Sequence, residues 1–152
     1  SHRAATKKQQ ELAKSLSEEE LKTLHTKYRL SLSDHIEKCV RRLPDHFPGF
    51  RVETIYGERG WGASASRDDF DGASASGIPQ LGRSSLYSRL EMTIRPYSKL
   101  TVIELAGKGT VRNKEIFNRT HFRKADEVEE DEYLKLIDAW VVEFAEQFAA
   151  NS

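Results

Sequence analysis

The chain of 152 residues has little cysteine and no long apolar run. Its one cysteine excludes a disulfide within the chain and is compatible with a reducing compartment. No stretch of about 18 apolar residues occurs, so a transmembrane helix is not expected. The first residues are polar and lack the apolar segment of a secretory leader. We therefore expect a soluble, cytoplasmic protein that makes no contact with a membrane.

The chain also lacks a net charge, because 24 Lys and Arg balance 24 Asp and Glu. The charges are nevertheless segregated: residues 83–124 hold ten Lys and Arg against three acids, a net +7. Residues 125–152 hold one Lys against nine acids, a net −8. Such blocks can mark an interaction surface, or they can lie side by side and neutralise each other, which is the favoured interpretation. The overall balance argues against nucleic acid as a partner.

The strongest periodic pattern predicts a C-terminal helix over residues 127–149. On a helical projection, seven large side chains fall within an arc of about 120°: Tyr133, Leu134, Ile137, Trp140, Val141, Phe144 and Phe148. Asp126 and Glu129 are predicted to cap its start. Burying seven such side chains contributes roughly 10–20 kcal/mol, so a sheet or a second helix is expected to cover this stripe.

A second amphipathic pattern predicts a long helix from Ser17 to Leu43. Ser17 and Glu20 match a capping box at its start, and Pro44 is expected to end it. Its apolar face consists of Leu21, Leu24, Tyr28, Leu32, Ile36, Cys39, Val40 and Leu43. Residues 1–16 are polar and are predicted to form a frayed helix or a flexible leader, while residues 17–152 are predicted to form a single domain.

Between the two helices, alternating apolar and polar residues predict about five antiparallel strands. They are expected over residues 50–56, 61–66, 86–94, 100–105 and 110–122. The second, rich in Ala, Gly and Ser, is expected near an edge, and a long mobile loop is expected over residues 67–83. Residues 107–109 should form a turn, and a bulge is expected at residues 116–117. The predicted fold is a two-layer α+β domain, a meander-like sheet with both helices on one face.

One sheet face offers candidate binding residues. Along the third predicted strand, the side opposite the apolar residues carries a mixture of charged and aromatic groups, and residues of the last strand join them if that strand lies nearby. The candidate ligand-binding residues are Tyr87, Arg89, Glu91, Arg95, Arg112 and His121. Such a face could bind an anionic small molecule or an acidic protein segment. A solvated sheet face carries similar residues without any function, and this is the commoner situation.

The sequence assigns no catalytic residue, metal ligand or cofactor. His35 and Cys39 are four residues apart on a predicted helix and therefore neighbours, but Cys39 is central in the apolar arc, which favours a buried, inert thiol. The leading hypothesis is a small binding or assembly domain. The alternative is a small-ligand enzyme with a cavity between sheet and helices, in which Glu91 and His121 act as an acid–base pair and nearby arginines bind an anion. A homodimer formed through the same face or an edge strand is a further hypothesis.

Overall fold

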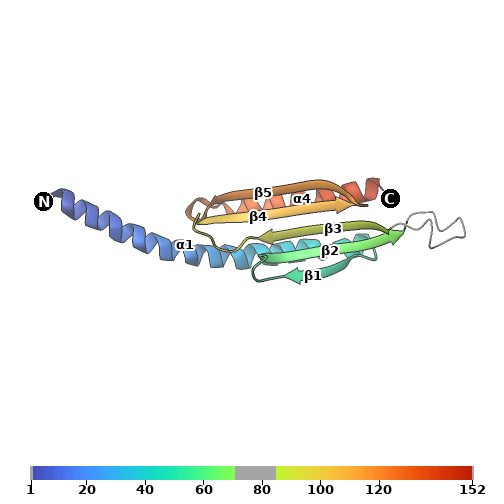
Figure 1. Ribbon diagram of the computed structural model, residues 1–152, viewed down its shortest axis with the longest axis horizontal. Helices are drawn as coiled ribbons and strands as arrows, with labels where there is room; N and C mark the ends of the chain where they lie inside the picture. Colours follow the sequence, from blue (N-terminus) through green and yellow to red (C-terminus); the bar gives the residue numbers. More distant parts are fainter. Residues whose placement is uncertain (1, 71–84, 152) are drawn as a thin grey trace, which may run out of the picture.

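The computed structural model describes the backbone of residues 2–70 and 85–151, with side chains from residue 18 onward in these ranges. The elements follow in the order α1 (His2–Val40), α2 (Leu43–His46), β1 (Arg51–Ile55), β2 (Trp61–Phe70), β3 (Ser85–Ile94), β4 (Val102–Val111), β5 (Lys114–Lys124), the 3₁₀ turn η2 (Ala125–Glu127) and α4 (Glu130–Ala150). The five strands form one antiparallel sheet in the order β1-β2-β3-β4-β5, so each pairs with its neighbour in sequence. The predicted two-layer α+β meander is confirmed (Figure 1).

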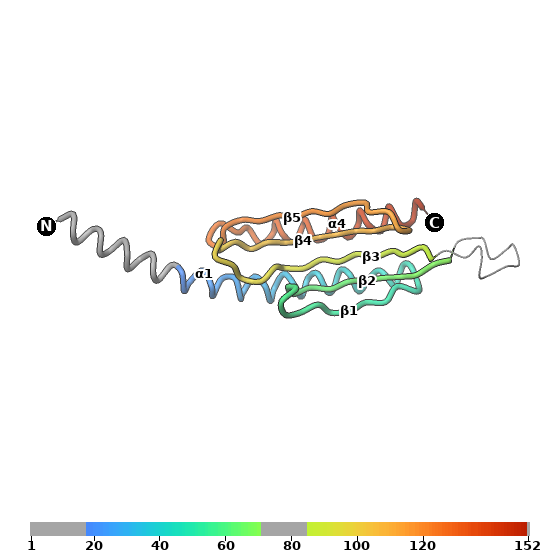
Figure 2. Tube along the Cα trace, viewed as in Figure 1, coloured from blue at the N-terminus to red at the C-terminus, as the bar shows by residue number. Residues whose placement is uncertain are grey.

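Both long helices lie on the same side of the sheet. α1 packs on β2 and β3, α4 packs on β4 and β3, and the two helices also contact each other. The chain trace shows them side by side behind the strands (Figure 2). Along β3, Leu90 and Met92 are buried beneath the helices, whereas Arg89 and Glu91 point to the other side. The sheet therefore has one covered face, and we call the other side, which bears Arg89 and Glu91, the open face.

The apolar stripe of α4 is buried as predicted. Phe144 is 0% exposed, whereas Val142, outside the predicted arc, is 52% exposed. The rings of Phe144 and Phe148 pack edge-on against Phe50, which precedes β1. The C-terminal helix is thereby joined to the segment that connects α1 to the sheet.

The helix starts differ from their predicted positions. α4 begins at Glu130 with Glu129 as N-cap and no capping side chain, while Asp126 lies in η2, so the predicted Asp126–Glu129 cap is wrong. α1 continues through residue 17, so Ser17 does not begin a helix. The predicted leader covers residues 1–16, and α1 includes the backbone of this segment from His2 onward. The side chains of these residues lie outside the described part of the chain. Pro44 sits in the first turn of α2, where its missing N–H costs nothing.

β2 is longer than predicted. It lies next to the edge strand β1, which agrees with its expected place near an edge, and it continues to Phe70. Residues 67–70 of the predicted loop are therefore strand, and its remaining residues, 71–83, lie outside the described residues. Ala63 and Ala65 are buried on the covered face. Their small side chains face the side on which α1 packs against this strand.

The turn predicted at residues 107–109 is wrong, because β4 passes straight through them. A Cβ atom on Gly107 would lie 2.6 Å from Cε3 of Trp140, so the close approach of α4 excludes a side chain here. The chain turns instead at Arg112 and Asn113, whose φ angles of 48° and 70° are positive. Two consecutive residues with positive φ are typical of a tight hairpin turn.

The bulge predicted at residues 116–117 is confirmed. Gly109 pairs with Phe117 and Thr110 pairs with Glu115, so Ile116 is the extra residue of β5. After this shift in register, every second residue of β5 points toward the helices, and these residues are Phe117, Arg119, His121 and Arg123.

Replacing Phe144 by Ala should lower the free energy of unfolding by roughly 3–5 kcal/mol, as expected for a fully buried aromatic ring. Val142→Ala, on the exposed side of the same helix, should change it by only about 0.5 kcal/mol. Urea unfolding followed by circular dichroism measures both variants. Equal losses in the two variants would mean that the stripe is not buried in the folded chain.

His25 ties α1 to the end of β3. It is 3% exposed, and its Nε2 lies 3.1 Å from the backbone carbonyl oxygen of Arg95. Burial lowers the pKa of His25 from its ordinary value; the hydrogen bond to Arg95 opposes this shift, and nearby Arg29 adds to it. The imidazole is therefore held neutral in the folded protein and donates the hydrogen bond from Nε2.

Acid should destabilise the protein through His25. Because its folded-state pKa lies below the unfolded value of about 6.5, the unfolded chain binds a proton first as the pH falls. The stability contribution is complete above pH about 6.5 and is lost between that value and the lower folded pKa. Urea unfolding at about pH 7.5 and about pH 5.5 should show a weaker pH dependence for His25→Gln than for wild type. A His25→Gln variant with the same pH dependence as wild type would contradict the assignment.

Candidate functional site

The open face of the sheet carries most of the predicted binding residues. In the part of the chain that the structure describes, no helix packs on this face. Tyr87, Arg89, Glu91 and Arg95 alternate with the buried residues of β3 and project to this side. The prediction that these residues share one face follows from the two-residue period of a strand, and the observed register agrees with it.

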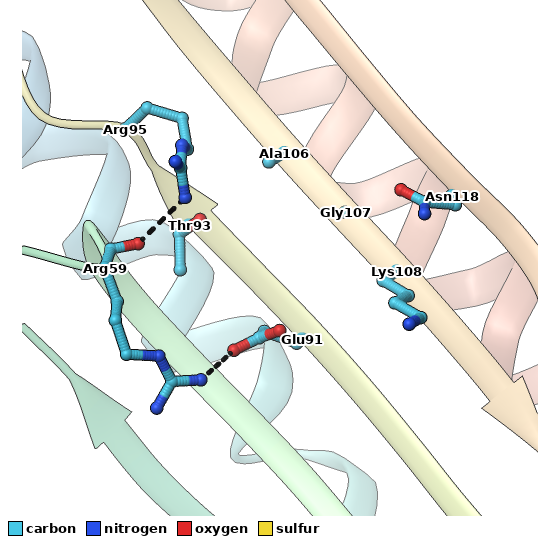
Figure 3. Close-up of a pocket in the computed structure, with 8 residues that line it drawn as sticks. All are labelled: Arg59, Glu91, Thr93, Arg95, Ala106, Gly107, Lys108 and Asn118. Atoms are coloured by element: carbon cyan, nitrogen blue, oxygen red, sulfur yellow. Dashed lines mark hydrogen bonds and ion pairs between the residues drawn. The ribbon is translucent and has the colours of Figure 1, made fainter.

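A shallow hollow of about 230 Å³ lies at the centre of the open face (Figure 3). Ala106 and Thr93 are cross-strand partners, and their small side chains leave space between longer neighbours. The residues that line the hollow are Arg59, Glu91, Thr93, Arg95, Ala106, Gly107, Lys108 and Asn118. The sequence pattern missed Arg59, Lys108 and Asn118, because they come from the turn before β2, from β4 and from β5, and only the folded sheet brings these segments together.

Ion pairs cross the open face. Glu91 accepts hydrogen bonds from Arg59 at 2.8 Å and from Arg89 at 3.2 Å. Arg95 Nε lies 3.7 Å from Glu104, and Lys108 Nζ lies 3.7 Å from Glu115. The face is therefore not uniformly basic as the charge block suggested, since acids alternate with its cations. Within the hollow itself, three cations face the single carboxylate of Glu91.

Arg112 and His121 do not join the other candidates. The guanidinium of Arg112 lies 5.6 Å from the ring centroid of Phe148, on the covered side of the sheet. His121 faces α4, where its Nε2 pairs with Glu132. The sheet therefore separates His121 from Glu91, and the structure does not assemble the acid–base pair of the enzyme hypothesis. The bulge at Ile116 determines the face of the sheet to which His121 points, and the position of the bulge follows from the strand register.

Part of the basic block is neutralised by the acidic helix. Arg119 makes two hydrogen bonds to Glu143, at 3.1 and 2.8 Å, and Arg123 lies 3.4 Å from Glu132. With His121, these residues form a row of pairs between β5 and α4. The favoured interpretation of the charge asymmetry is confirmed for this strand, while the cations of β3 and β4 remain on the other face.

An apolar patch adjoins the hollow. Leu100 is 73% exposed and Phe122 is 56% exposed, and with Val102 they form the apolar part of a second depression of about 390 Å³. Its charged lining residues are Glu104, Arg123, Lys124 and Glu127. Val102, Glu104 and Ala106 alternate along β4 on the open face, so the strand leads from the patch into the hollow. Clustered exposed apolar side chains of this kind mark interaction surfaces more often than single ones do.

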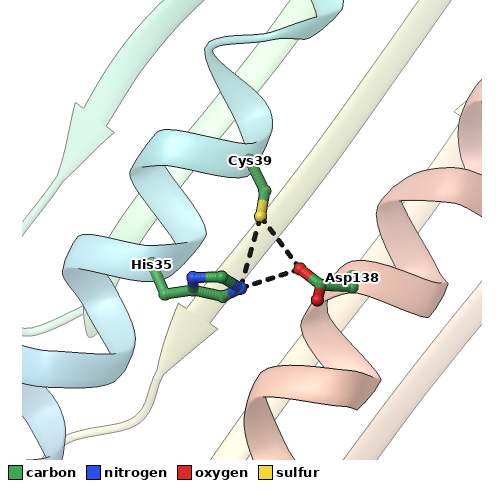
Figure 4. Close-up of side chains that lie close together, drawn as sticks. All are labelled: His35, Cys39 and Asp138. Carbon is green, nitrogen blue, oxygen red and sulfur yellow. Dashed lines mark hydrogen bonds and ion pairs between the residues drawn. The ribbon is translucent and has the colours of Figure 1, made fainter.

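A different cluster lies between the two long helices, away from the sheet. His35 Nε2 is 2.7 Å from Asp138 Oδ1, Cys39 Sγ is 3.2 Å from the same oxygen, and Sγ is 3.5 Å from Nε2 (Figure 4). The cluster borders a pocket of about 570 Å³, also lined by Arg42, His46 and Val141. The sequence pattern found His35 and Cys39 as neighbours but missed Asp138, which only the packing of α4 on α1 brings to them.

Burial raises the pKa of the Cys39 thiol to about 12, and Asp138 acts in the same direction. Burial also acts to raise the pKa of Asp138, but hydrogen bonds from His35 and Cys39, and nearby Arg42, hold it below its usual value. The thiol is therefore protonated at neutral pH and donates its hydrogen to an ionised carboxylate. A nucleophilic role for Cys39 is disfavoured because the thiolate fraction is negligible.

The chain matches no protein-family model, no curated protein and no solved structure. Among the described residues, no helix is both long enough and apolar enough to span a membrane.

Cys39 should react slowly with iodoacetamide in the folded protein. With a pKa of about 12 instead of 9.0, its thiolate fraction near pH 8 is about a thousandfold lower. Asp138→Asn removes the adjacent negative charge, so the midpoint of the pH–rate profile should move to lower pH. Glu146→Gln removes a carboxylate from the same pocket and should leave the midpoint unchanged. Mass spectrometry measures the rates, and an unshifted midpoint in Asp138→Asn would contradict the assignment.

Proposed function

We propose that this chain is a binding domain that docks an acidic segment of a partner protein on the open face of its sheet. One observation carries the proposal: a hollow ringed by Arg59, Arg95 and Lys108 adjoins an exposed apolar patch. A carboxylate of the segment would enter the hollow, and an apolar side chain of the same segment would cover Leu100 and Phe122.

The hollow supports recognition of a carboxylate. Arg59 is hydrogen-bonded to Glu91 at 2.8 Å. Arg95 and Lys108 are held less tightly, since each lies 3.7 Å from its own acidic partner. Both side chains are about half exposed and can turn toward a ligand without losing a strong ion pair. The Thr93 hydroxyl and the Asn118 amide, also at the hollow, add neutral hydrogen-bond donors.

The position of the apolar patch favours a peptide segment over a small anion. Val102 and Ala106 are four residues apart on β4, which corresponds to about 13 Å along a strand. An extended segment with an acidic and an apolar residue at about the same spacing would reach both sites. Nucleic acid is disfavoured because Glu91, Glu104 and Glu115 lie among the cations. The described cations therefore form no continuous row along which a phosphate backbone could be neutralised, whereas a single carboxylate needs only those at the hollow.

The enzyme alternative has less support. Its acid–base pair, Glu91 and His121, lies on opposite faces of the sheet, and each residue is already paired, with Arg59 and Glu132 respectively. The hollow is open and shallow, whereas catalysis on a small ligand usually takes place in a deep, water-excluding pocket.

Fluorescence anisotropy tests the proposal with a labelled synthetic peptide in which Leu and Glu are about four residues apart. Arg95→Gln and Lys108→Gln should each weaken its binding by roughly fivefold, since a partly exposed ionic contact contributes about 1 kcal/mol. Phe122→Ser should weaken it as well, because the apolar contact is lost. Affinity should fall as salt is raised, as expected for exposed charges.

Arg119→Gln is the matched control, because Arg119 is similarly exposed but lies on the covered side, paired with Glu143. It should bind the peptide as wild type does. A peptide with Lys in place of Glu should not bind. Equal binding of both peptides, or equal affinity of the Arg95 and Arg119 variants, would exclude docking in the hollow. Size-exclusion chromatography distinguishes a second outcome, in which the open face joins two copies of the chain.

A further inference from the structure

The side chains of His35, Cys39 and Asp138 bring three metal-ligating atoms to one point between α1 and α4, all within 4.8 Å of one another. We propose that these residues bind a divalent transition-metal ion, with Zn²⁺ as the ion that best fits the donors. This site is separate from the proposed docking face, since it lies on the outer side of the helix layer.

The distances between the donors are close to those of a coordination sphere. With Zn–N and Zn–O bonds of about 2.0 Å and a Zn–S bond of about 2.3 Å, tetrahedral ligands lie about 3.3–3.5 Å apart. The observed separations are 3.5 Å for N···S, 3.2 Å for S···O and 2.7 Å for N···O. Only the His35–Asp138 contact has to lengthen appreciably. Both groups are partly exposed and have room to move.

The same geometry argues against a catalytic triad. In a triad, the histidine contacts the nucleophile with one ring nitrogen and the carboxylate with the other. Here Nε2 of His35 is the nitrogen nearest to both Cys39 and Asp138. A single nitrogen shared in this way suits donors that converge on a common ion. It does not suit a relay of hydrogen bonds.

The helices hold the donors in place before any ion arrives. His35 and Cys39 lie on successive turns of α1, a spacing that puts two side chains on one face. Ile36 and Val40 on this helix are buried in the core, and Ile137 next to Asp138 anchors α4 in the same way. Metal sites built on packed helices are more precise than sites on loops, because the backbone positions are fixed.

The charges of the site also fit a divalent ion. When Cys39 binds the ion, its thiol proton leaves to solvent, so one thiolate and one carboxylate neutralise the two positive charges. A neutral centre can lie beside the apolar side chains of Leu43 and Val141 at low cost. The remaining position faces the pocket of about 570 Å³ and would be filled by water. Lys38, Arg42, His46 and Glu146 are the other charged or titratable groups at this pocket.

Titration of the untagged full chain with Co²⁺ and Zn²⁺ tests the proposal. Co²⁺ should bind in a 1:1 ratio and give a thiolate-to-cobalt charge-transfer band in the near ultraviolet, and Zn²⁺ should displace it. Cys39→Ser should abolish this band. His35→Gln and Asp138→Asn should each weaken Zn²⁺ binding by at least about tenfold, because a ligand is lost. Asp138 is exposed, so its variant remains informative if the buried Cys39 variant folds poorly.

His121→Gln is the matched control, since His121 and Glu132 form a histidine–carboxylate pair without a thiol. This variant should keep the band and the wild-type affinity. The proposal is overturned if the cobalt complex lacks the thiolate band. It is also overturned if the Asp138 and His35 variants bind Zn²⁺ as tightly as wild type, or if His121→Gln weakens binding as much as they do.

Discussion

The apolar stripe of α4 is buried between the sheet and α1, and this burial determines where the other surfaces of the molecule lie. Phe148 packs 5.0 Å from both Phe47 and Phe50, between ring centroids, so the end of the chain holds the segment that follows α1. Trp140 lies against Gly107, which fixes the height of α4 above β4. Because the stripe needs an apolar partner of its own length, both long helices share one face of the sheet.

The two faces of the sheet acquire different chemistry from this arrangement. On the covered face, cations of β5 meet the acids of α4, and Arg119 and Glu143 form the best-aligned pair. On the open face, which no helix of the described residues covers, Glu91 is shared by Arg89 of β3 and by Arg59 of the turn before β2. Arg95 and Lys108 are less tightly paired. The docking proposal depends on this difference between tightly and loosely paired cations.

Packing one helix against another creates a second kind of surface on the outer side of the helix layer. Asp138 lies on α4 beside the apolar stripe of this helix, and it contacts His35 and Cys39 of α1. Polar groups that close the edge of a core must satisfy one another, and these three do so through mutual hydrogen bonds. The same convergence that satisfies them supplies the donors of the proposed metal site.

The sequence alone determined the two amphipathic helices, the antiparallel strands, the bulge at Ile116 and the shared face of Arg89, Glu91 and Arg95. Each of these depends on residues close together in the chain, whose period and spacing are visible directly. Only the tertiary structure decided that Gly107 lies within a strand under Trp140, that His121 faces α4, and that Asp138 reaches Cys39. These are contacts between distant segments, and sequence periodicity does not record which helix lies over which strand or at what height.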